Sequence, residues 1–135
     1  MERNDGATNY DGLPKDVLIV EDDPLIAIDV EESLRKLGVA SIRTAASVTL
    51  ALDMIAGRNP EFALLNVDLG GENTLRIAKQ LDSLRTPFAF LTGYGARAEL
   101  AAQFAGRPKL NKPYSISELE ATLRRRTGGL RRADQ

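Results

Sequence analysis

Short apolar runs alternate along this chain with longer segments in which apolar residues recur at every third or fourth position. The runs cover residues 17–20, 39–44, 62–65 and 87–91, with a shorter one around Leu110. Continuous apolar runs of this length, bounded by turn residues, are typical of strands that are buried on both faces. In the second run Ser41 and Arg43 alternate with apolar residues, which predicts a half-exposed strand. The sequence therefore predicts five short strands.

The segments between these runs have helical spacing and recognisable ends. The first begins at Asp23-Pro24, a pair typical of an N-cap and the first helical residue, and it ends at Gly38. The last begins at Ser115, which with Glu118 has the spacing of a capping box. This last helix is predicted to end at Gly128–Gly129. Between the first and the last, helices are predicted from Ser47 to near Gly57, over 74–84, and as a short segment over 98–104.

Strands that alternate with helices predict βαβ units, right-handed crossovers and a parallel sheet. We therefore expect an α/β, flavodoxin-like doubly wound fold with the strand order 2-1-3-4-5. In that order the first and third strands are neighbours at the switch point of the sheet. Glu21, Asp22 and Asn66 would meet there, because they follow these two strands.

Polar residues stand at the carboxyl ends of four predicted strands, the edge where parallel sheets bind ligands. Glu21 and Asp22 follow the first strand, Asn66 the third, Thr92 the fourth and Lys112 the fifth. Two acids at this edge provide the oxygen ligands that Mg²⁺ prefers, and an ammonium beside them suits a phosphoryl group. Each residue also has a simpler interpretation: the acids as solvated loop charges, Thr92 as a strand-end hydroxyl and Lys112 as a surface charge.

The length and charge of the chain set its general class. Its 135 residues suit one domain with a core of its own. We expect that domain over residues 16–127, with flexible tails at 1–15 and 128–135. A net charge of −1 gives no overall attraction to nucleic acid or to an anionic membrane.

Missing residue types exclude several chemistries. The chain has no cysteine and no histidine, which excludes disulfides, thiolate nucleophiles, Ser-His-Asp triads and zinc held by either residue. The apolar runs are too short to span a bilayer. The polar N-terminus lacks the apolar core of a signal peptide. We therefore expect a cytoplasmic protein that contacts neither membrane nor nucleic acid.

Four pieces of sequence, in order, resemble the receiver domain of two-component response regulators. They are VLIVEDDP at 17–24, ALLNVDLGG at 63–71, FLTGYG at 90–95 and KPY at 112–114. The resemblance covers roughly residues 16–126 and implies a CheY-like fold. The piece at 90–94 also resembles the motif of the FAT GUY subclass, with Leu91 in place of the alanine of that motif. Members of that subclass are mostly short single-domain receivers of alphaproteobacteria, served by HWE or related histidine kinases.

The resemblance implies a role for each strand-end residue. Glu21 and Asp22 would hold Mg²⁺, Asp22 directly, together with the main-chain carbonyl of Asp68. Thr92 would hydrogen-bond a phosphoryl oxygen, and Lys112 would form an ion pair with it. Metal and ammonium would stabilise the charge in transfer. A monomer of this kind would accept phosphate from a sensor histidine kinase, or contact a downstream signalling protein, without enzymatic turnover of its own.

The chain departs from the family at two positions. The family acceptor is a carboxylate that becomes an aspartyl phosphate, whereas this chain has Asn66. An amide oxygen is a poor nucleophile, so we expect ordinary aspartyl phosphorylation to be blocked or absent and Mg²⁺ to bind weakly or not at all. Lys109 replaces the switch aromatic of the family. Tyr94 is then left to take a related role, and we expect it to anchor a partner surface.

Asn66 leaves several hypotheses open. It is either natural, which makes the chain a phosphorylation-independent pseudo-receiver that binds another protein, or engineered to lock the inactive form. Asp68 is an alternative acceptor, although two strand residues span about 6.6 Å and reacting atoms must approach within about 3–3.5 Å. A haloacid-dehalogenase-type phosphatase uses Asp-x-Asp after a strand, and Asn66 lacks its nucleophile. A flavodoxin-type cofactor binder is disfavoured because Glu21 and Asp22 would repel phosphate.

Overall fold

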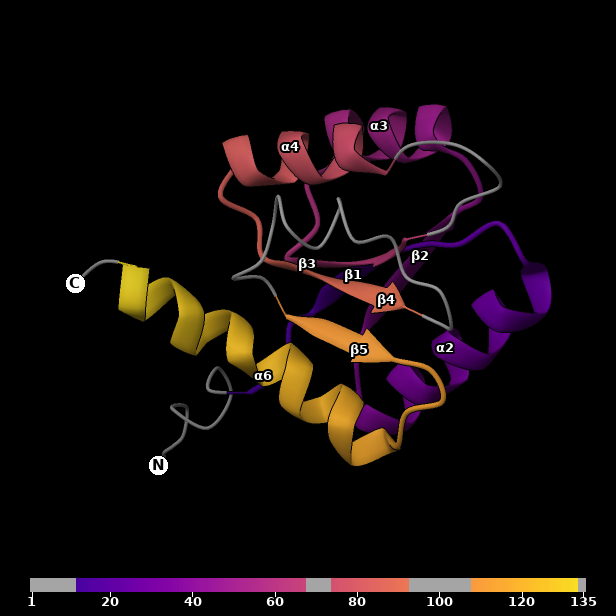
Figure 1. The fold of residues 1–135 in the computed structure, drawn as a ribbon, viewed down its shortest axis with the longest axis vertical. Helices are drawn as coiled ribbons and strands as arrows, with labels where there is room; N and C mark the ends of the chain where they lie inside the picture. The colour runs from indigo at the N-terminus through magenta and orange to yellow at the C-terminus, as the bar shows by residue number, and fades with distance from the viewer. Residues whose placement is uncertain (1–11, 68–73, 93–107, 134–135) are drawn as a thin grey trace.

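Five parallel strands form the sheet in the order β2-β1-β3-β4-β5 (Figure 1). The computed structural model describes residues 12–67, 74–92 and 108–133, with the side chains of the last helix described as far as Arg124. The elements are β1 (Asp16–Val20), α2 (Pro24–Leu37), β2 (Ser41–Ala45), α3 (Val48–Gly57), β3 (Phe62–Asn66), α4 (Leu75–Ser83), β4 (Phe88–Thr92), β5 (Lys109–Asn111) and α6 (Ile116–Ala133). The predicted flavodoxin-like fold is confirmed.

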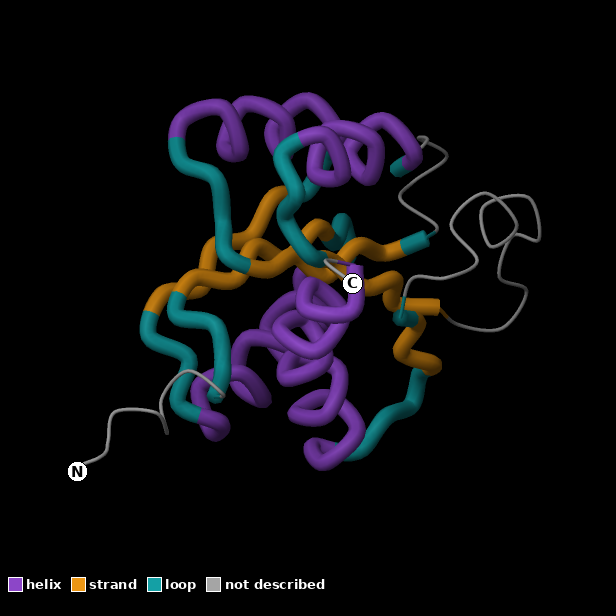
Figure 2. The backbone as a smooth tube through the Cα atoms, turned by 90° about the vertical axis from the view of Figure 1, so that its left-hand side faces the viewer, coloured by secondary structure: helices purple, strands orange, loops and turns teal. Residues whose placement is uncertain are grey.

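Helices cover both faces of the sheet and make three layers (Figure 2). Because side chains alternate between the faces of a strand, each strand contributes to two cores. Leu18 and Leu65 belong to the core under α3 and α4. Ile19 and Leu64 belong to the core under α2 and α6. The central strands β3 and β4 are buried along their whole length, which explains their continuous apolar sequence.

The predicted caps of the first helix are confirmed. Asp23 accepts hydrogen bonds from the backbone N–H groups of Leu25 and Ile26. Gly38 follows the last helical residue with a φ of 96°, a left-handed conformation that favours glycine. Asp23 thus fixes where α2 begins, directly after the acidic residues that follow β1, and Gly38 fixes where it ends.

The last helix begins as predicted but does not end as predicted. The backbone N–H of Ser115 donates to Glu118, and the N–H of Glu118 donates to the Ser115 hydroxyl, which confirms the capping box. The prediction that Gly128–Gly129 closes this helix is wrong, because α6 continues to Ala133. Glycine in a helix interior costs about 1 kcal/mol relative to alanine, which is too little to end an established helix by itself. No helix within the described ranges has the length and apolar character needed to cross a membrane.

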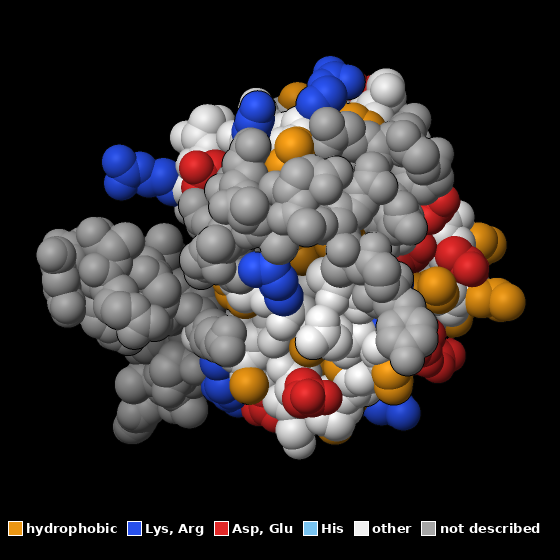
Figure 3. Space-filling model, in the orientation of Figure 1, with side chains coloured by type: hydrophobic (Ala, Val, Ile, Leu, Met, Phe, Trp, Pro, Cys, Tyr) orange, Lys and Arg blue, Asp and Glu red, His pale blue; other side chains and the backbone are white. Residues whose placement is uncertain are grey.

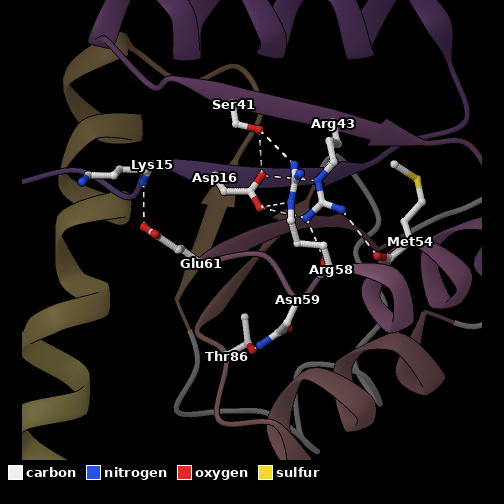
Figure 4. Close-up of polar contacts among 9 residues, drawn as sticks. All are labelled: Lys15, Asp16, Ser41, Arg43, Met54, Arg58, Asn59, Glu61 and Thr86. Atoms are coloured by element: carbon white, nitrogen blue, oxygen red, sulfur yellow. Dashed lines mark hydrogen bonds and ion pairs between the residues drawn. The ribbon is translucent and has the colours of Figure 1, made fainter.

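The edge of the sheet where the strands begin carries a network of ion pairs (Figure 4). Asp16, the first residue of β1, lies 3.0 Å from Nη2 of Arg43 and 3.2 Å from Nε of Arg58. It also accepts a hydrogen bond from the Ser41 hydroxyl. Burial raises the pKa of Asp16, but these donors outweigh burial and bring the pKa below its ordinary value. The network joins β1, β2 and the end of α3.

Some predictions concern residues outside the described ranges. These are the short helix at 98–104 and the positions of Asp68 and Tyr94. The predicted tail at 1–15 is described only from residue 12. In that part Leu13 packs against the core under α2 and α6, and the backbone N–H of Lys15 donates to Glu61.

Candidate functional site

Glu21 lies at the centre of the candidate site, at the edge of the sheet where the strands end. Val20 and Leu65 are register partners, so the residues that follow them, Glu21 and Asn66, are neighbours. The side chain of Glu21 is only 1% exposed. Its Oε2 accepts hydrogen bonds from Nδ2 of Asn66 and from the backbone N–H of Asp23, each 3.1 Å long. The predicted meeting of Glu21 and Asn66 is thus observed.

Lys112, the residue after β5, reaches the same carboxylate. Its Nζ lies 3.6 Å from Oε1 of Glu21, a separation that makes an ion pair but not a hydrogen bond. Within the described part of the chain, Oε1 is buried and has no hydrogen-bond partner. Burial raises the pKa of Glu21, the hydrogen bond from Asp23 and the charge of Lys112 lower it, and Asp22 raises it, with a net increase above the ordinary value.

The chemical identity of residue 66 decides how this cluster is held together. Asn66 lies between Leu65 and Val67, which face α3 and α4, so the side chain of Asn66 is on the face covered by α2 and α6. Its amide nitrogen can donate to the buried Glu21 carboxylate, which an ionised aspartate cannot do. Asn66 therefore supplies a neutral donor at a position where a carboxylate would place two like charges together.

Thr92 is buried at the same edge but has a different partner. Its hydroxyl donates to the side-chain oxygen of Asn111, the residue opposite it in the register of β4 and β5. Leu91 faces the α2 and α6 side, so alternation places Thr92 on the opposite face from Asn66. The side chain of Thr92 therefore lies on the other face from that of Asn66, and Thr92 is linked to the cluster through the backbone, where the N–H of Lys112 donates to the Thr92 carbonyl.

Asn111 was not anticipated from the sequence as a site residue. It is polar and directly precedes Lys112, which is the one local signal of its position at the strand ends. Its contact with Thr92 depends on the pairing register of β5 with β4, which the sequence pattern does not specify. Lys109, at the other end of β5, is exposed.

Tyr114 lies just beyond the cluster and packs against the core under α2 and α6. Its hydroxyl is buried and has no hydrogen-bond partner among the described residues. Burial, followed by the charges of Asp29 and Glu21, raises the pKa of Tyr114 to about 12. The phenol is therefore neutral at physiological pH and does not act as an anion at this edge.

The described residues fit a divalent cation only weakly. Glu21 and Asp22 bring two carboxylates to the edge, and Asp22 is exposed. Oε2 of Glu21 is already engaged by Asn66, and Oε1 faces the ammonium of Lys112. No group of three acidic, histidine or cysteine residues suited to a metal occurs in the described ranges. Oε1 of Glu21 is the carboxylate oxygen of this pair that is buried without a hydrogen-bond donor among the described residues.

Comparison with known proteins identifies the family to which this chain belongs. A family model of the response regulator receiver domain matches residues 17–124. The chain belongs to this family. Receiver domains interact with histidine kinases or with downstream signalling partners and generally bind Mg²⁺ at their acidic pocket. The family match favours a receiver over the phosphatase and flavin-binder hypotheses.

Curated relatives of this receiver are longer proteins. It is 31% identical over 112 residues to sensory transduction protein LytT of Bacillus subtilis, covering 81% of this chain and 46% of LytT. It is 30% identical over 110 residues to transcriptional regulatory protein PdtaR of Mycobacterium tuberculosis, covering 79% of this chain and 54% of PdtaR. The receiver thus spans about half the length of these relatives.

Solved structures agree with the fold. The solution structure of SdrG from Sphingomonas melonis Fr1 has a TM-score of 0.76 and 32% identity, covering 84% of this receiver and 97% of SdrG. The solution structure of the PhyR receiver domain from Erythrobacter litoralis has a TM-score of 0.74 and 28% identity, covering 91% and 94% of the two chains.

Proposed function

We propose that this receiver takes part in two-component phosphorelay signalling with its phosphoacceptor position blocked by Asn66. The hydrogen bond from Nδ2 of Asn66 to Oε2 of Glu21 carries the proposal. A family acceptor needs an anionic oxygen to attack phosphorus. Asn66 has a neutral amide, and its nitrogen is committed to a buried carboxylate. An ordinary aspartyl phosphate therefore does not form at this position.

The alternative is a phosphorylation-independent pseudo-receiver that binds another protein. The internal partners of the pocket favour it, because Glu21 is held by Asn66 and Lys112 and Thr92 by Asn111. Of the groups that would otherwise face a metal or a phosphoryl group, Oε2 of Glu21 and the Thr92 hydroxyl are hydrogen-bonded to neighbouring side chains, and Oε1 of Glu21 is ion-paired with Lys112. Such a pocket keeps one conformation without either ligand, as a constitutive binding module requires.

Magnesium binding follows the same chemistry. When bound, Mg²⁺ would neutralise charge at the pocket, and Glu21 and Asp22 would hold it, with the main-chain carbonyl of Asp68 as a third ligand. Asn66 offers a neutral oxygen in place of the anionic one that a hard cation prefers. Mg²⁺ therefore binds weakly, in the millimolar range or above.

The partner class is a histidine kinase of the HWE or a related type, or a protein downstream of it. The FAT GUY-like residues at 90–94 support this assignment, and Tyr94 is the proposed anchor on that segment. A second contact is proposed on α2, where Leu25 is 77% and Ile28 51% exposed. Apolar groups protrude beside carboxylates over α2, on the right of Figure 3. A partner surface that is apolar and basic complements this face.

Phosphotransfer from a histidine kinase of this type tests the proposed function. The autophosphorylated kinase is mixed with the parent receiver or with the Asn66→Asp variant, and radiolabel on the receiver is followed over time. We expect label on Asn66→Asp alone, together with binding of the kinase by both proteins. Radiolabel on the parent would contradict the proposed block of phosphorylation at position 66. Absence of kinase binding by both proteins would contradict the proposed partner class.

A further inference from the structure

Thr92 and Asn111 form a cross-strand pair at the end of the sheet where the pocket lies. They are the last residues of β4 and β5 and are register partners. The backbone N–H of Lys112, the next residue, donates to the carbonyl of Thr92 over 2.8 Å, which extends the pairing past the strand end. The Thr92 hydroxyl is buried and donates to Oδ1 of Asn111.

A threonine hydroxyl carries a single proton. A phosphoryl oxygen only accepts hydrogen bonds, so Thr92 must donate that proton to bind one. In this structure the proton is given to Asn111 instead. The contact also holds the Thr92 side chain on the α3 and α4 face, whereas Asn66 lies on the α2 and α6 face. A phosphoryl group at the pocket must therefore break the bond between Thr92 and Asn111 before it can use Thr92.

We propose that Asn111 is a positioning residue that withholds the Thr92 hydroxyl from a phosphoryl ligand, as a barrier separate from Asn66. The proposal rests on the proposed function, since it takes the pocket as the phosphoryl site. Asn111 determines how tightly the pocket holds a phosphoryl group. The residue at position 66 determines whether that group becomes covalently attached to the protein. A neutral hydrogen bond contributes enough to change the affinity for such a ligand by about threefold to tenfold.

The test uses beryllofluoride, a non-covalent phosphoryl mimic, with Mg²⁺ on the full chain. Asn66→Asp provides the carboxylate that this probe needs, and Asn111→Ala is added to it. We expect affinity to increase by about threefold to tenfold. Asn111→Val repeats the substitution with a residue that favours strands, and thermal melting confirms that each variant is folded. The matched control is Asn59→Ala, because Asn59 accepts a 2.9 Å hydrogen bond from Thr86 at the opposite edge of the sheet (Figure 4).

A double-mutant cycle separates positioning from a general structural effect. If Asn111 acts through Thr92, then Asn111→Ala has no effect on affinity once Thr92→Val has removed the hydroxyl. Unchanged or weaker binding on Asn111→Ala overturns the inference and leaves the proposed function intact. An equal gain in the Thr92→Val background, or with Asn59→Ala, also overturns it. If Asn66→Asp itself fails to bind the probe, the assignment of the pocket fails, and the inference fails with it.

Discussion

The side-chain amide of Asn66 donates a 3.1 Å hydrogen bond to Oε2 of Glu21 inside the buried edge of the sheet. This contact ties the two strands of the switch point together without a metal ion. It also defines what the substitution of a carboxylate at position 66 would do. The donor would be lost, and a second negative charge would face a carboxylate whose pKa is already raised by burial.

Asn66→Asp is therefore expected to destabilise the metal-free protein. The buried Glu21 carboxylate loses a donor and gains a like charge, which together cost about 1–3 kcal/mol. Urea unfolding of both proteins with a chelator present measures the difference. Asn59→Asp, an amide-to-acid change in an exposed residue of the opposite edge, serves as the control and should cost less. Equal stability of Asn66→Asp and the parent would show that the bond to Glu21 contributes nothing.

Magnesium should have little effect on the parent and a larger effect on Asn66→Asp. The parent offers two carboxylates, one of them paired with Lys112, whereas the variant adds an anionic ligand of the kind that hard cations prefer. Amide chemical shifts near Glu21 and Asp22 should move in the parent only at millimolar Mg²⁺. The variant should bind more tightly and recover stability with the metal. Tight binding by the parent in titration calorimetry would be incompatible with this view of the pocket.

The Asp16 network predicts a loss of stability in acid. The folded pKa of Asp16 lies below its ordinary value of 3.8, so the ionised group stabilises the fold above that value. This stabilisation is lost as pH falls through the folded pKa. Asp16→Asn should cost about 1.5–3 kcal/mol at neutral pH, and the difference from the parent should shrink below pH 3.8. Denaturant unfolding at several pH values checks this, with the exposed Asp53→Asn as control. A difference that stays constant with pH would contradict the assignment.

The exposed residues of α2 can be tested for partner contact. Leu25→Ser and Ile28→Ser should weaken kinase binding by about tenfold together, because each removes apolar surface from the proposed contact. Both side chains are more than half exposed, so stability should change by less than about 0.5 kcal/mol. Leu50→Ser on α3 is the matched control, since Leu50 is 44% exposed on the other side of the sheet. Equal loss of binding in the control would argue for a nonspecific apolar effect.

The elements were predictable because local signals set them. Apolar runs marked the strands, and Asp23, Gly38 and the Ser115–Glu118 box marked helix ends through contacts within a few residues. The alternation of strands and helices then predicted a parallel sheet with the strand order that the structure shows. The end of α6 was mispredicted at Gly128–Gly129, because a glycine pair weakens a helix without necessarily stopping it.

The site was predictable only in part. Glu21 and Asn66 meet because they follow neighbouring strands, a consequence of topology. The partner of Thr92 depends on the register of β5 with β4, and the Asp16 network depends on side chains 25 to 42 residues apart in sequence. Contacts of this kind depend on how neighbouring strands are aligned, and the spacing of apolar residues along the sequence does not specify that alignment.

Treatment with acetyl phosphate and Mg²⁺, followed by intact-mass measurement, tests the role of residue 66 most directly. The parent should gain no phosphate, because Asn66 lacks an anionic oxygen, while Asn66→Asp should gain the mass of one phosphate in a base-labile form. A phosphate gain by the parent that disappears in Asp68→Ala would contradict the block at position 66 and place the acceptor at Asp68.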